Sequence, residues 1–568
     1  MEERVARRWL KHYPSEIPHQ IDYDEKPLFE YLTEAYLDAP NKEALYFLGK
    51  KMTYKELYEE VVTFSSRLVE LGLEKGDRVS IMLPNCPQAV ISYYGVLMAG
   101  GVVVQTNPMY IERELEFQLH DSKSKMIIVL DLLFPKVAKV KENSSLQKVI
   151  VTKLEDYLPF PKNWLYPIIE KKKQPIHVQI EYMNDVLSFK TLLKDKIKEP
   201  PTVSIDSKED VALLQYTGGT TGLPKGVMLT HFNLVANTMQ CQAWVYKAKK
   251  GEERVLAVLP FFHVYGMTVS MNFSIMYQSL LIILPRFELE EVLKTIEKQK
   301  PTLFPGAPTM YISLLNHPKI QNYDLSSINA CISGSAPLPV EIQEQFEALT
   351  KGRLVEGYGL TEASPVTHAN LVWEKRVKGS IGIPWPDTDA LILKIGRDEP
   401  ADLNEIGELV VKGPQVMKGY FEKPDETKLT LRNGYLYTGD LAYMDEEGYF
   451  YLVDRKKDMI IAGGFNIYPR EIEEVLYEHP DIKEVVVVGI PDPYRGETVK
   501  AYIVLKDGVT GDIDKLDAYC RKNLAAYKVP HVYEFRKELP KTMVGKILRR
   551  ALVEEERRKF EEEKINKK

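Results

Sequence analysis

Hydrophobic residues follow two alternating patterns along this chain, one with the period of a helix and one of short, continuous apolar runs. Residues 54–73 (YKELYEEVVTFSSRLVELGL) have helical periodicity, and the run at 78–83 (RVSIML) follows them after a turn-like EKGD. Further apolar runs typical of strands occupy 124–130, 148–152, 211–215 and 279–285. Strands that alternate with helices predict an α/β fold of largely parallel sheets with helices on both faces.

Two stretches without Asp, Glu, Lys or Arg, residues 85–111 and 256–285, are long enough to cross a membrane. Both are interrupted by Pro, Gly, Asn, Gln or His, and both lie within otherwise soluble sequence. We therefore expect buried helix–strand units of the α/β fold and no transmembrane span.

The pattern changes near Asp454, where five charged residues, DRKKD at 454–458, separate two apolar runs. The remaining chain has the size of an ordinary domain. It predicts a helix at 469–479, where Pro469 suits a first helical turn, and a strand at 484–490. We expect a large N-terminal domain at 1–454 and a small α+β domain at 458–568.

Composition narrows the class of protein. A chain of 568 residues is too long for one small core, and a net charge of −6 argues against a general nucleic-acid binder. The four cysteines are far apart and form no C-x-x-C pair, so neither a disulfide framework nor a zinc site is indicated. The first residues, MEERVARRWLKHYP, lack the apolar core of a secretory signal. We expect a cytoplasmic protein.

Residues 156–174 (DYLPFPKNWLYPIIEKKKQ) interleave aromatic residues with prolines and end in lysines. A solvated surface excursion is the simpler interpretation. The alternative is an interfacial anchor, with Tyr157, Phe160, Trp164 and Tyr166 at the lipid headgroups and three lysines, Lys171, Lys172 and Lys173, on anionic lipid. That alternative predicts weak peripheral membrane contact.

Residues 216–226 read YTGGTTGLPKG, a glycine- and threonine-rich stretch of the kind that wraps a phosphate. The P-loop pattern G-x-x-x-x-G-K-[ST] does not fit, because Lys225 follows a proline and precedes Gly226, where Ser or Thr should stand. Pro224 also disfavours helix geometry at Leu223. The residues predict a strand followed by a flexible hydroxyl-rich loop, and a plain mobile turn stays the alternative.

Four further stretches accompany this loop: LPFFHVYGMT (259–268), GSAPLP with EGYGLTEASP (334–339 and 356–365), YLYTGDLAYMDEEGYFYLVDRKKDMI (435–460) and LPKTMVGKILRR (539–550). From about residue 51 to residue 550, their order and spacing resemble the adenylate-forming superfamily of acyl-CoA synthetases, luciferases and non-ribosomal peptide adenylation domains. The run at 433–460, with LPNCPQ (83–88) and TNPMYIERELEFQL (106–119), is similar to bacterial long-chain fatty acid–CoA ligases.

The resemblance implies a two-step ligation that uses ATP, Mg²⁺ and coenzyme A. A carboxylate attacks the α-phosphorus of ATP and pyrophosphate leaves, and the CoA thiol then displaces AMP. Such transfer depends mostly on positioning and charge neutralisation. A clamp on the departing β- and γ-phosphates is therefore implied for Thr217, Gly218, Gly219, Thr220, Thr221, Gly222, Leu223, Pro224, Lys225 and Gly226.

Other residues match the family's nucleotide and acyl contacts. The resemblance implies that Glu362 binds Mg²⁺, a cation that takes few protein ligands, with help from Thr217. It places Thr361 at the α-phosphate and Asp440 with Arg455 at the ribose. The adenine and acyl pocket would be lined by Gly334, Glu356, Gly357, Tyr358, His263 and Val264. A lone His in an apolar run is more often a packed core residue, so we expect His263 to bind and not to act as a base.

Lys546 is implied as the catalytic lysine, because an ammonium can follow charge that develops on the α-phosphate. It lies in the small domain, so catalysis requires that domain to be mobile and to close over the large one. The family's pivot matches a hinge at 455–457, with Lys457 at its centre. Rotation there would bring residues 461–467 (IAGGFNI), including Gly464, to the pantetheine tunnel.

The substrate is the least constrained point. Amino-acid-activating domains usually carry an Asp just after the position of Phe262, and this chain has none. Each methylene buried in an apolar tunnel contributes about 0.8 kcal/mol, so tunnel depth decides chain length. We expect a long-chain fatty acid, with a medium-chain or aromatic acid as the alternative.

A non-catalytic nucleotide-binding protein and a P-loop-type ATPase are alternatives from other classes. The oligomeric state stays open, with a homodimer among the options.

Overall fold

The computed structural model describes residues 7–165, 180–217, 224–462, 465–492, 495–541 and 547–566. The chain divides into two compact units, each built from separate segments. The large unit comprises Trp9–Asp389 and Lys412–Leu436, and the small unit comprises Met1–Arg8, Ala390–Val411 and Tyr437–Lys568.

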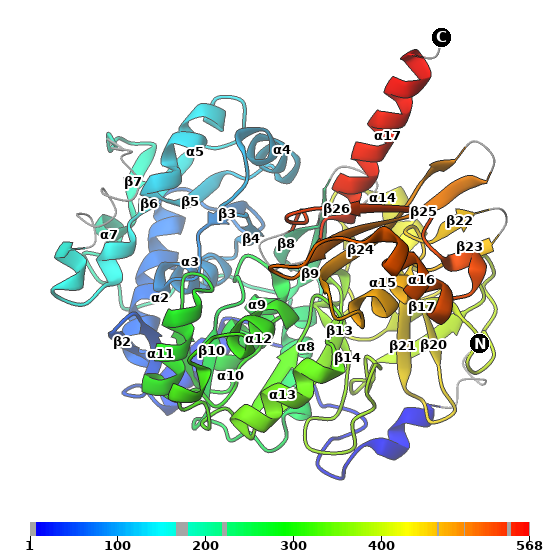
Figure 1. The fold of residues 1–568 in the computed structure, drawn as a ribbon. Coiled ribbons are helices and arrows are strands. Elements are labelled where there is room, and N and C mark those ends of the chain that lie inside the picture. The colour runs from blue at the N-terminus through cyan, green and yellow to red at the C-terminus, as the bar shows by residue number, and fades with distance from the viewer. Residues whose placement is uncertain are drawn as a thin grey trace. The chain divides into compact units, whose positions relative to one another are not determined.

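An eight-stranded sheet forms the centre of the large unit (Figure 1). Its middle is parallel from β8 to β7, and β9 and β18 extend it in the antiparallel sense. Because parallel strands are covered on both faces, they read as continuous apolar runs, which is the pattern that predicted them. In sheet order the strands are β18 (Gly419–Tyr420), β9 (Lys225–Thr230), β8 (Val211–Thr217), β4 (Val102–Gln105), β3 (Arg78–Met82), β5 (Met126–Leu130), β6 (Lys148–Thr152) and β7 (Val186–Ser188).

Two four-stranded sheets also lie in the large unit, and both mix parallel and antiparallel pairs. In order, the first has β10 (Arg254–Ala257), β11 (Leu280–Ile283), β1 (Glu43–Phe47) and β2 (Lys50–Thr53), and the second has β12 (Ala330–Ser333), β13 (Arg353–Gly359), β14 (Val366–Ala369) and β15 (Ile383–Pro384).

Two long helices of the large unit, α2 and α8, begin at capping boxes. The α2 helix starts at a capping box in which Thr53 and Glu56 bond reciprocally. The longer helices are α1 (Glu30–Asp38), α2 (Tyr54–Glu70), α3 (Pro87–Met98), α4 (Glu112–Ser122), α5 (Phe134–Lys141), α8 (His231–Trp244), α11 (Leu289–Gln299), α12 (Pro308–Leu315), α13 (Val340–Thr350) and α14 (Pro424–Thr430). Shorter turns are α7 (Phe189–Leu192), α9 (Val264–Gly266), α10 (Phe273–Met276), the π-helical η5 (Met267–Asn272), and the 3₁₀ segments η2 (Arg8–His12), η3 (Asp131–Leu133), η4 (Leu154–Tyr157), η6 (Ile320–Asn322) and η7 (Thr361–Ala363).

The small unit contains most strands of one sheet, whose strand Leu431–Arg432 belongs to the segment Lys412–Leu436, and the whole of another. The first has the order β16 (Asp389–Leu393), β17 (Gly407–Lys412), β20 (Tyr435–Met444) and β19 (Leu431–Arg432), with β21 (Phe450–Arg455) paired to β20. The second has the order β23 (Phe465–Ile467), β22 (Ile460–Ala462), β25 (Gly496–Leu505) and β24 (Ile482–Asp492), with β26 (Val532–Phe535) on β25. Its helical segments are α15 (Pro469–Tyr477), α16 (Ile513–Asn523), η8 (Ala526–Lys528) and α17 (Arg549–Asn566).

The α/β prediction is confirmed, including the parallel sheet. Every residue of α3 is buried, and β10 and β11 are largely buried, so the two uncharged stretches are helix–strand units as expected. No helix in the described ranges is both long and apolar enough to cross a membrane. The domain boundary at residue 454 and the hinge at 455–457 stay predictions.

One expectation about residues 156–174 is wrong. Tyr157 does not face a headgroup zone, because it is only 6% exposed and its hydroxyl donates to the carboxylate of Glu60. Phe160 and Trp164 are exposed, at 84% and 69%. Tyr166 and the three lysines lie outside the described residues.

Candidate functional site

The predicted phosphate loop connects two antiparallel strands. In the register of β8 and β9, Thr217 lies opposite Lys225 and Tyr216 opposite Gly226, so the loop leaves and returns at one end of the central sheet. Lys225 thus begins a strand, whereas a P-loop lysine opens a helix, which agrees with the rejection of that motif. Gly218, Gly219, Thr220, Thr221, Gly222 and Leu223 lie outside the described residues, and Pro224 is the last residue before β9.

Glu362 lies near this hairpin, on the single turn η7 that begins at Thr361. Its Oε1 accepts a hydrogen bond of 2.9 Å from the hydroxyl of Tyr420. The ammonium of Lys225 lies 5.1 Å from the centre of the Tyr420 ring and forms an ion pair with Glu426. One tyrosine therefore joins the predicted metal ligand to the predicted phosphate-binding lysine.

The oxygen atoms around Glu362 decide whether a divalent cation can bind there. Mg²⁺ takes one or two carboxylates and obtains its other oxygens from phosphates and water. Oε2 of Glu362 receives no hydrogen bond or ion pair from any other described residue, which leaves it as a hard oxygen ligand. The described residues contain no group of three or more His, Cys, Asp or Glu that could hold a metal ion by themselves. Glu362 therefore fits a cation that arrives with a nucleotide, and the assistance of Thr217 stays a prediction.

The predicted adenine and acyl residues lie on or directly after two parallel strands. Gly334 follows β12, and Glu356, Gly357 and Tyr358 lie on its neighbour β13, where Glu356 accepts from the N–H of Leu338 at 3.2 Å. A Cβ at Gly334 would lie 3.0 Å from the ring of Tyr265, whose hydroxyl is bonded to a backbone carbonyl. The hydroxyl bond restrains the ring, so a larger residue at 334 would be tightly packed against it.

His263 caps the short helix α9, with Val264 buried behind it. Its Nδ1 accepts from the N–H of Tyr265 at 3.4 Å. Two residues that the sequence did not single out hold this turn: Asn85 bonds the backbone of Leu259 and Phe261, and Gln215 donates to the carbonyl of Phe262 at 3.1 Å. These contacts fix the backbone of the turn, and a binding role for His263 stays a prediction.

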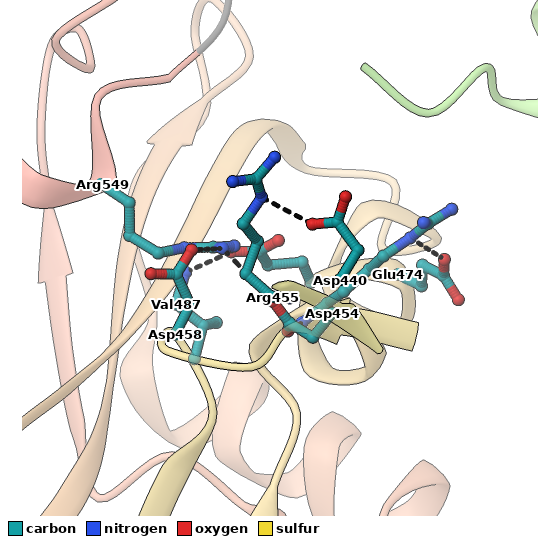
Figure 2. Close-up of polar contacts among 9 residues, drawn as sticks. Asp440, Asp454, Arg455, Asp458, Glu474, Val487 and Arg549 are labelled. Carbon is teal, nitrogen blue, oxygen red and sulfur yellow. Dashed lines mark hydrogen bonds and ion pairs between the residues drawn. The ribbon is translucent and has the colours of Figure 1, made fainter. Parts of the chain in front are cut away.

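In the small unit, Asp440 and Arg455 lie side by side on β20 and β21, directly opposite each other in register. Figure 2 shows Oδ1 of Asp440 paired with Nε of Arg455, at 2.7 Å. The aspartate is 5% exposed and the arginine side chain 36% exposed. The two predicted ribose contacts thus form one rigid polar pair that faces outward through its cation.

The predicted hinge follows directly. Residues 456–458 form a turn after β21, closed by a bond of 3.0 Å from the N–H of Asp458 to the carbonyl of Arg455, and Lys457 is exposed at its tip. Gly464 and Lys546 lie outside the described residues. The hairpin that carries Gly464 has the register Ala462 opposite Phe465.

A second cluster beside the turn was not foreseen. Arg549, the first residue of α17, forms ion pairs with Asp454 at 3.6 Å and with Asp458 at 3.3 Å (Figure 2). It also forms an ion pair with Glu473. Asp454 also accepts from the N–H of Arg470 at 2.9 Å. Burial raises the pKa of Asp454 to about 6, although Arg549 acts in the opposite direction.

Comparison with protein families finds two matches that together span both units. Residues 32–421 match the AMP-binding enzyme family, and residues 471–546 match the AMP-binding enzyme C-terminal domain.

Individual proteins agree with these families. The chain is 58% identical to a long-chain-fatty-acid–CoA ligase of Bacillus subtilis, with 96% of this chain and 98% of that protein covered. It is 40% identical to the ligase of that name from Salmonella typhimurium, with 98% of this chain and all of that protein covered.

Solved structures are similar over the same length. ATP-bound MatB from Rhodopseudomonas palustris is 28% identical with a TM-score of 0.81, covering 93% of this chain and 98% of that one. The anthranilate CoA ligase AuaEII in complex with anthranoyl-AMP is 26% identical with a TM-score of 0.82, covering 96% of this chain and 98% of that one. The chain belongs to the AMP-binding enzyme family.

Proposed function

We propose that this protein is an ATP-dependent long-chain fatty acid–CoA ligase of the AMP-forming type. It first joins the fatty acid to AMP with release of pyrophosphate, and then transfers the acyl group to the CoA thiol with release of AMP. The observation that carries the proposal is the 58% identity, over nearly the whole of both chains, to a protein of that activity. The ATP-bound neighbour and the neighbour in complex with anthranoyl-AMP agree with the adenylate step.

In this proposal, the residues of the large unit bind the phosphates, the cation, the adenine and the acyl group. Lys225 and the loop that starts at Thr217 bind the departing β- and γ-phosphates, and Thr361 contacts the α-phosphate. Glu362 and Thr217 hold Mg²⁺, which neutralises phosphate charge when bound. Glu356, Gly357 and Tyr358 bind the adenine, while His263, Val264 and Gly334 line the acyl site.

The small unit supplies the ribose contacts and the lysine. Asp440 accepts hydrogen bonds from the ribose hydroxyls, and Arg455, already paired to it, adds a donor beside them. Lys546 follows the negative charge that develops on the α-phosphate in the first half-reaction. Lys457 is the pivot that withdraws it, and Gly464 then lines the path of the pantetheine.

A fatty acid is favoured over an aromatic acid because the similarity is unequal. The fatty-acid ligases are 58% and 40% identical to this chain, whereas the anthranilate ligase is 26% identical. The turn at 260–267, PFFHVYGM, also offers no carboxylate to pair with an amino-acid substrate. A medium-chain or aromatic acid remains the second candidate.

The decisive experiment is a panel of carboxylic acids of increasing chain length, with benzoate-type acids included, scored for ATP-dependent CoA thioester and for pyrophosphate. We expect both products with long-chain fatty acids and little of either with aromatic acids. Thioester formed only from aromatic acids would favour the second candidate. Release of inorganic phosphate without pyrophosphate would overturn the ligase proposal.

We further propose weak contact with a membrane through residues 156–165. Long-chain acids partition into bilayers, so an enzyme that samples the interface meets more substrate. Phe160 and Trp164 are exposed apolar side chains four residues apart in one short segment, and aromatic rings prefer the headgroup zone. With Tyr157 buried, these two carry the described part of the contact.

Liposome flotation with anionic vesicles tests this contact. We expect Trp164→Ala combined with Phe160→Ala to lower the bound fraction several-fold. Leu37→Ala is the matched control, because Leu37 is also 69% exposed but lies on α1. Equal flotation of wild type, control and double variant at low and high salt would reduce the segment to a surface loop.

A further inference from the structure

Tyr420 occupies a fixed position between two parts of the nucleotide site. It lies on the two-residue strand β18, opposite Val227 of β9. Its N–H donates to Oγ1 of Thr427 at 2.9 Å, and the next residue, Phe421, donates to the carbonyl of Gly226 at 2.8 Å. The side chain is 7% exposed. Backbone bonds on both sides therefore hold the tyrosine against the strand that begins at Lys225.

The two faces of this side chain have different partners. The hydroxyl donates to Oε1 of Glu362 at 2.9 Å, and a buried tyrosine normally requires such a partner. The ring lies under the ammonium of Lys225 at 5.1 Å, within the range of a cation–π contact.

Glu362 is held from the same segment by its backbone as well. The N–H of Met417, three residues before Tyr420, donates to the carbonyl of Glu362 at 2.8 Å. With Oε1 bonded to the tyrosine, the carboxylate cannot rotate freely about its last torsion. Oε2 is then kept in one direction, which is the arrangement that a metal ligand needs from its surroundings.

Lys225 has a second attraction that a nucleotide would have to overcome. Its ammonium pairs with the carboxylate of Glu426 on α14, while the tyrosine ring lies beneath it. A triphosphate carries more negative charge than one carboxylate and competes for the ammonium. The contact with the Tyr420 ring is retained when a phosphate replaces Glu426 as the partner of Lys225, so the ring keeps the ammonium near its position.

We propose that Tyr420 is a positioning residue for the metal–nucleotide site, its hydroxyl orienting Glu362 for the cation and its ring seating Lys225 for the phosphates. This inference rests on the proposed function, because it takes Glu362 and Lys225 as the metal and phosphate contacts. Tyr420 itself touches neither the reacting carboxylate nor the α-phosphorus in this role.

The test is calorimetric binding of ATP to the whole protein with and without Mg²⁺. Tyr420→Phe keeps the ring and loses the hydroxyl, so we expect about a tenfold rise in the half-saturating Mg²⁺ concentration, the size of one charged hydrogen bond. ATP binding without metal should change less than about twofold on the same scale. Tyr420→Leu also loses the ring and should weaken metal-free ATP binding.

Tyr23→Phe is the matched control, because the hydroxyl of Tyr23 donates to a carboxylate, that of Asp387, at the same 2.9 Å. Glu362→Gln supplies the second background: if Tyr420 acts through Glu362, Tyr420→Phe has no further effect on Mg²⁺ dependence there. The proposal is overturned if Tyr420→Phe and Tyr23→Phe have the same Mg²⁺ dependence of ATP binding. It is also overturned if Tyr420→Phe raises the half-saturating Mg²⁺ concentration as much in the Glu362→Gln background as in the wild type. Failure of the wild type to form acyl-CoA would instead overturn the proposed function and leave the binding result intact.

Discussion

Three aspartates of the small unit are paired with two arginines. Asp440 pairs with Arg455, whereas Asp454 and Asp458 both face Arg549 (Figure 2). The first pair has an exposed cation and suits a ligand. The second cluster has a guanidinium that is only 21% exposed, with Glu473 as a third carboxylate, and suits a structural role. Charge alone does not separate these roles, but burial and geometry do.

The first residue-scale prediction concerns Lys546. Lys546→Ala should lower adenylate formation by several orders of magnitude while thioester formation from a supplied acyl-adenylate stays within a few-fold of wild type. The reason is that its ammonium stabilises charge only in the first half-reaction. Single-turnover assays of each half-reaction measure this, and equal losses in both would contradict the division of roles.

The second residue-scale prediction concerns pH. Burial gives Asp454 a folded-state pKa of about 6, above the 3.8 of the free carboxyl, so the folded protein binds the proton more tightly than the unfolded chain. This group therefore adds stability as the pH falls through 6 and withdraws it as the pH rises. Between pH 7 and pH 5 we expect the stability of wild type relative to Asp454→Asn to increase by ~1 kcal/mol.

Thermal and denaturant unfolding at both pH values check this difference. Asp458→Asn is the control, since it also removes a partner of Arg549, but the Asp458 side chain is 23% exposed against 3% for Asp454. A pH-dependent change of the same size in both variants would assign the effect to the ion pairs and not to the titration of Asp454.

At the scale of elements, the turn at 456–458 separates the two sheets of the small unit. Strand β21 ends at Arg455 in the first sheet, and β22 begins at Ile460 in the second. Contacts also bridge the turn, from Arg470 and Arg549 to Asp454. A rotation at the proposed hinge would have to carry these contacts along or exchange them.

Lys457→Pro tests the hinge. Proline fixes φ near −65° and restricts the preceding residue, so the turn should be confined to one conformation. We expect one half-reaction to fall by more than about tenfold and the other to be largely retained. Lys457→Ala removes the charge and leaves the torsion free, so it should resemble wild type in both assays. Wild-type rates for Lys457→Pro would move the pivot elsewhere.

What could be predicted from the sequence depended on how local each feature is. The strand at 211–215 and the helix that starts at Tyr54 were predicted because apolar periodicity is a property of neighbouring residues. The roles of Tyr420 and Arg549 were missed because their partners, Glu362 and Asp454, lie far away in the chain. Tyr157 was misjudged because aromatic content does not indicate which side of a segment is buried.

The whole molecule adds a topological argument for the hinge. Beyond Trp9, the chain passes between the two units after Asp389, after Val411 and after Leu436. A body joined by several backbone connections cannot rotate far without straining them. The chain does not return to the large unit after Leu436, but β20 and β21 are hydrogen-bonded into one sheet with the earlier strands β16, β17 and β19. This favours a moving body that begins near residue 458 and leaves the first sheet of the small unit behind.

The turn at 456–458 also determines the effective concentration at which the last part of the chain meets the rest of the protein. In the proposed mechanism, the part of the chain that carries Lys546 acts on the nucleotide as a tethered group, and short flexible linkers keep such groups at millimolar effective concentration. This effective concentration does not change when the protein is diluted. Doubling the length of the linker raises the free energy of closure by only about 0.6 kcal/mol. Both half-reactions then use catalytic groups of the same chain, so the turnover rate of each molecule does not depend on the enzyme concentration.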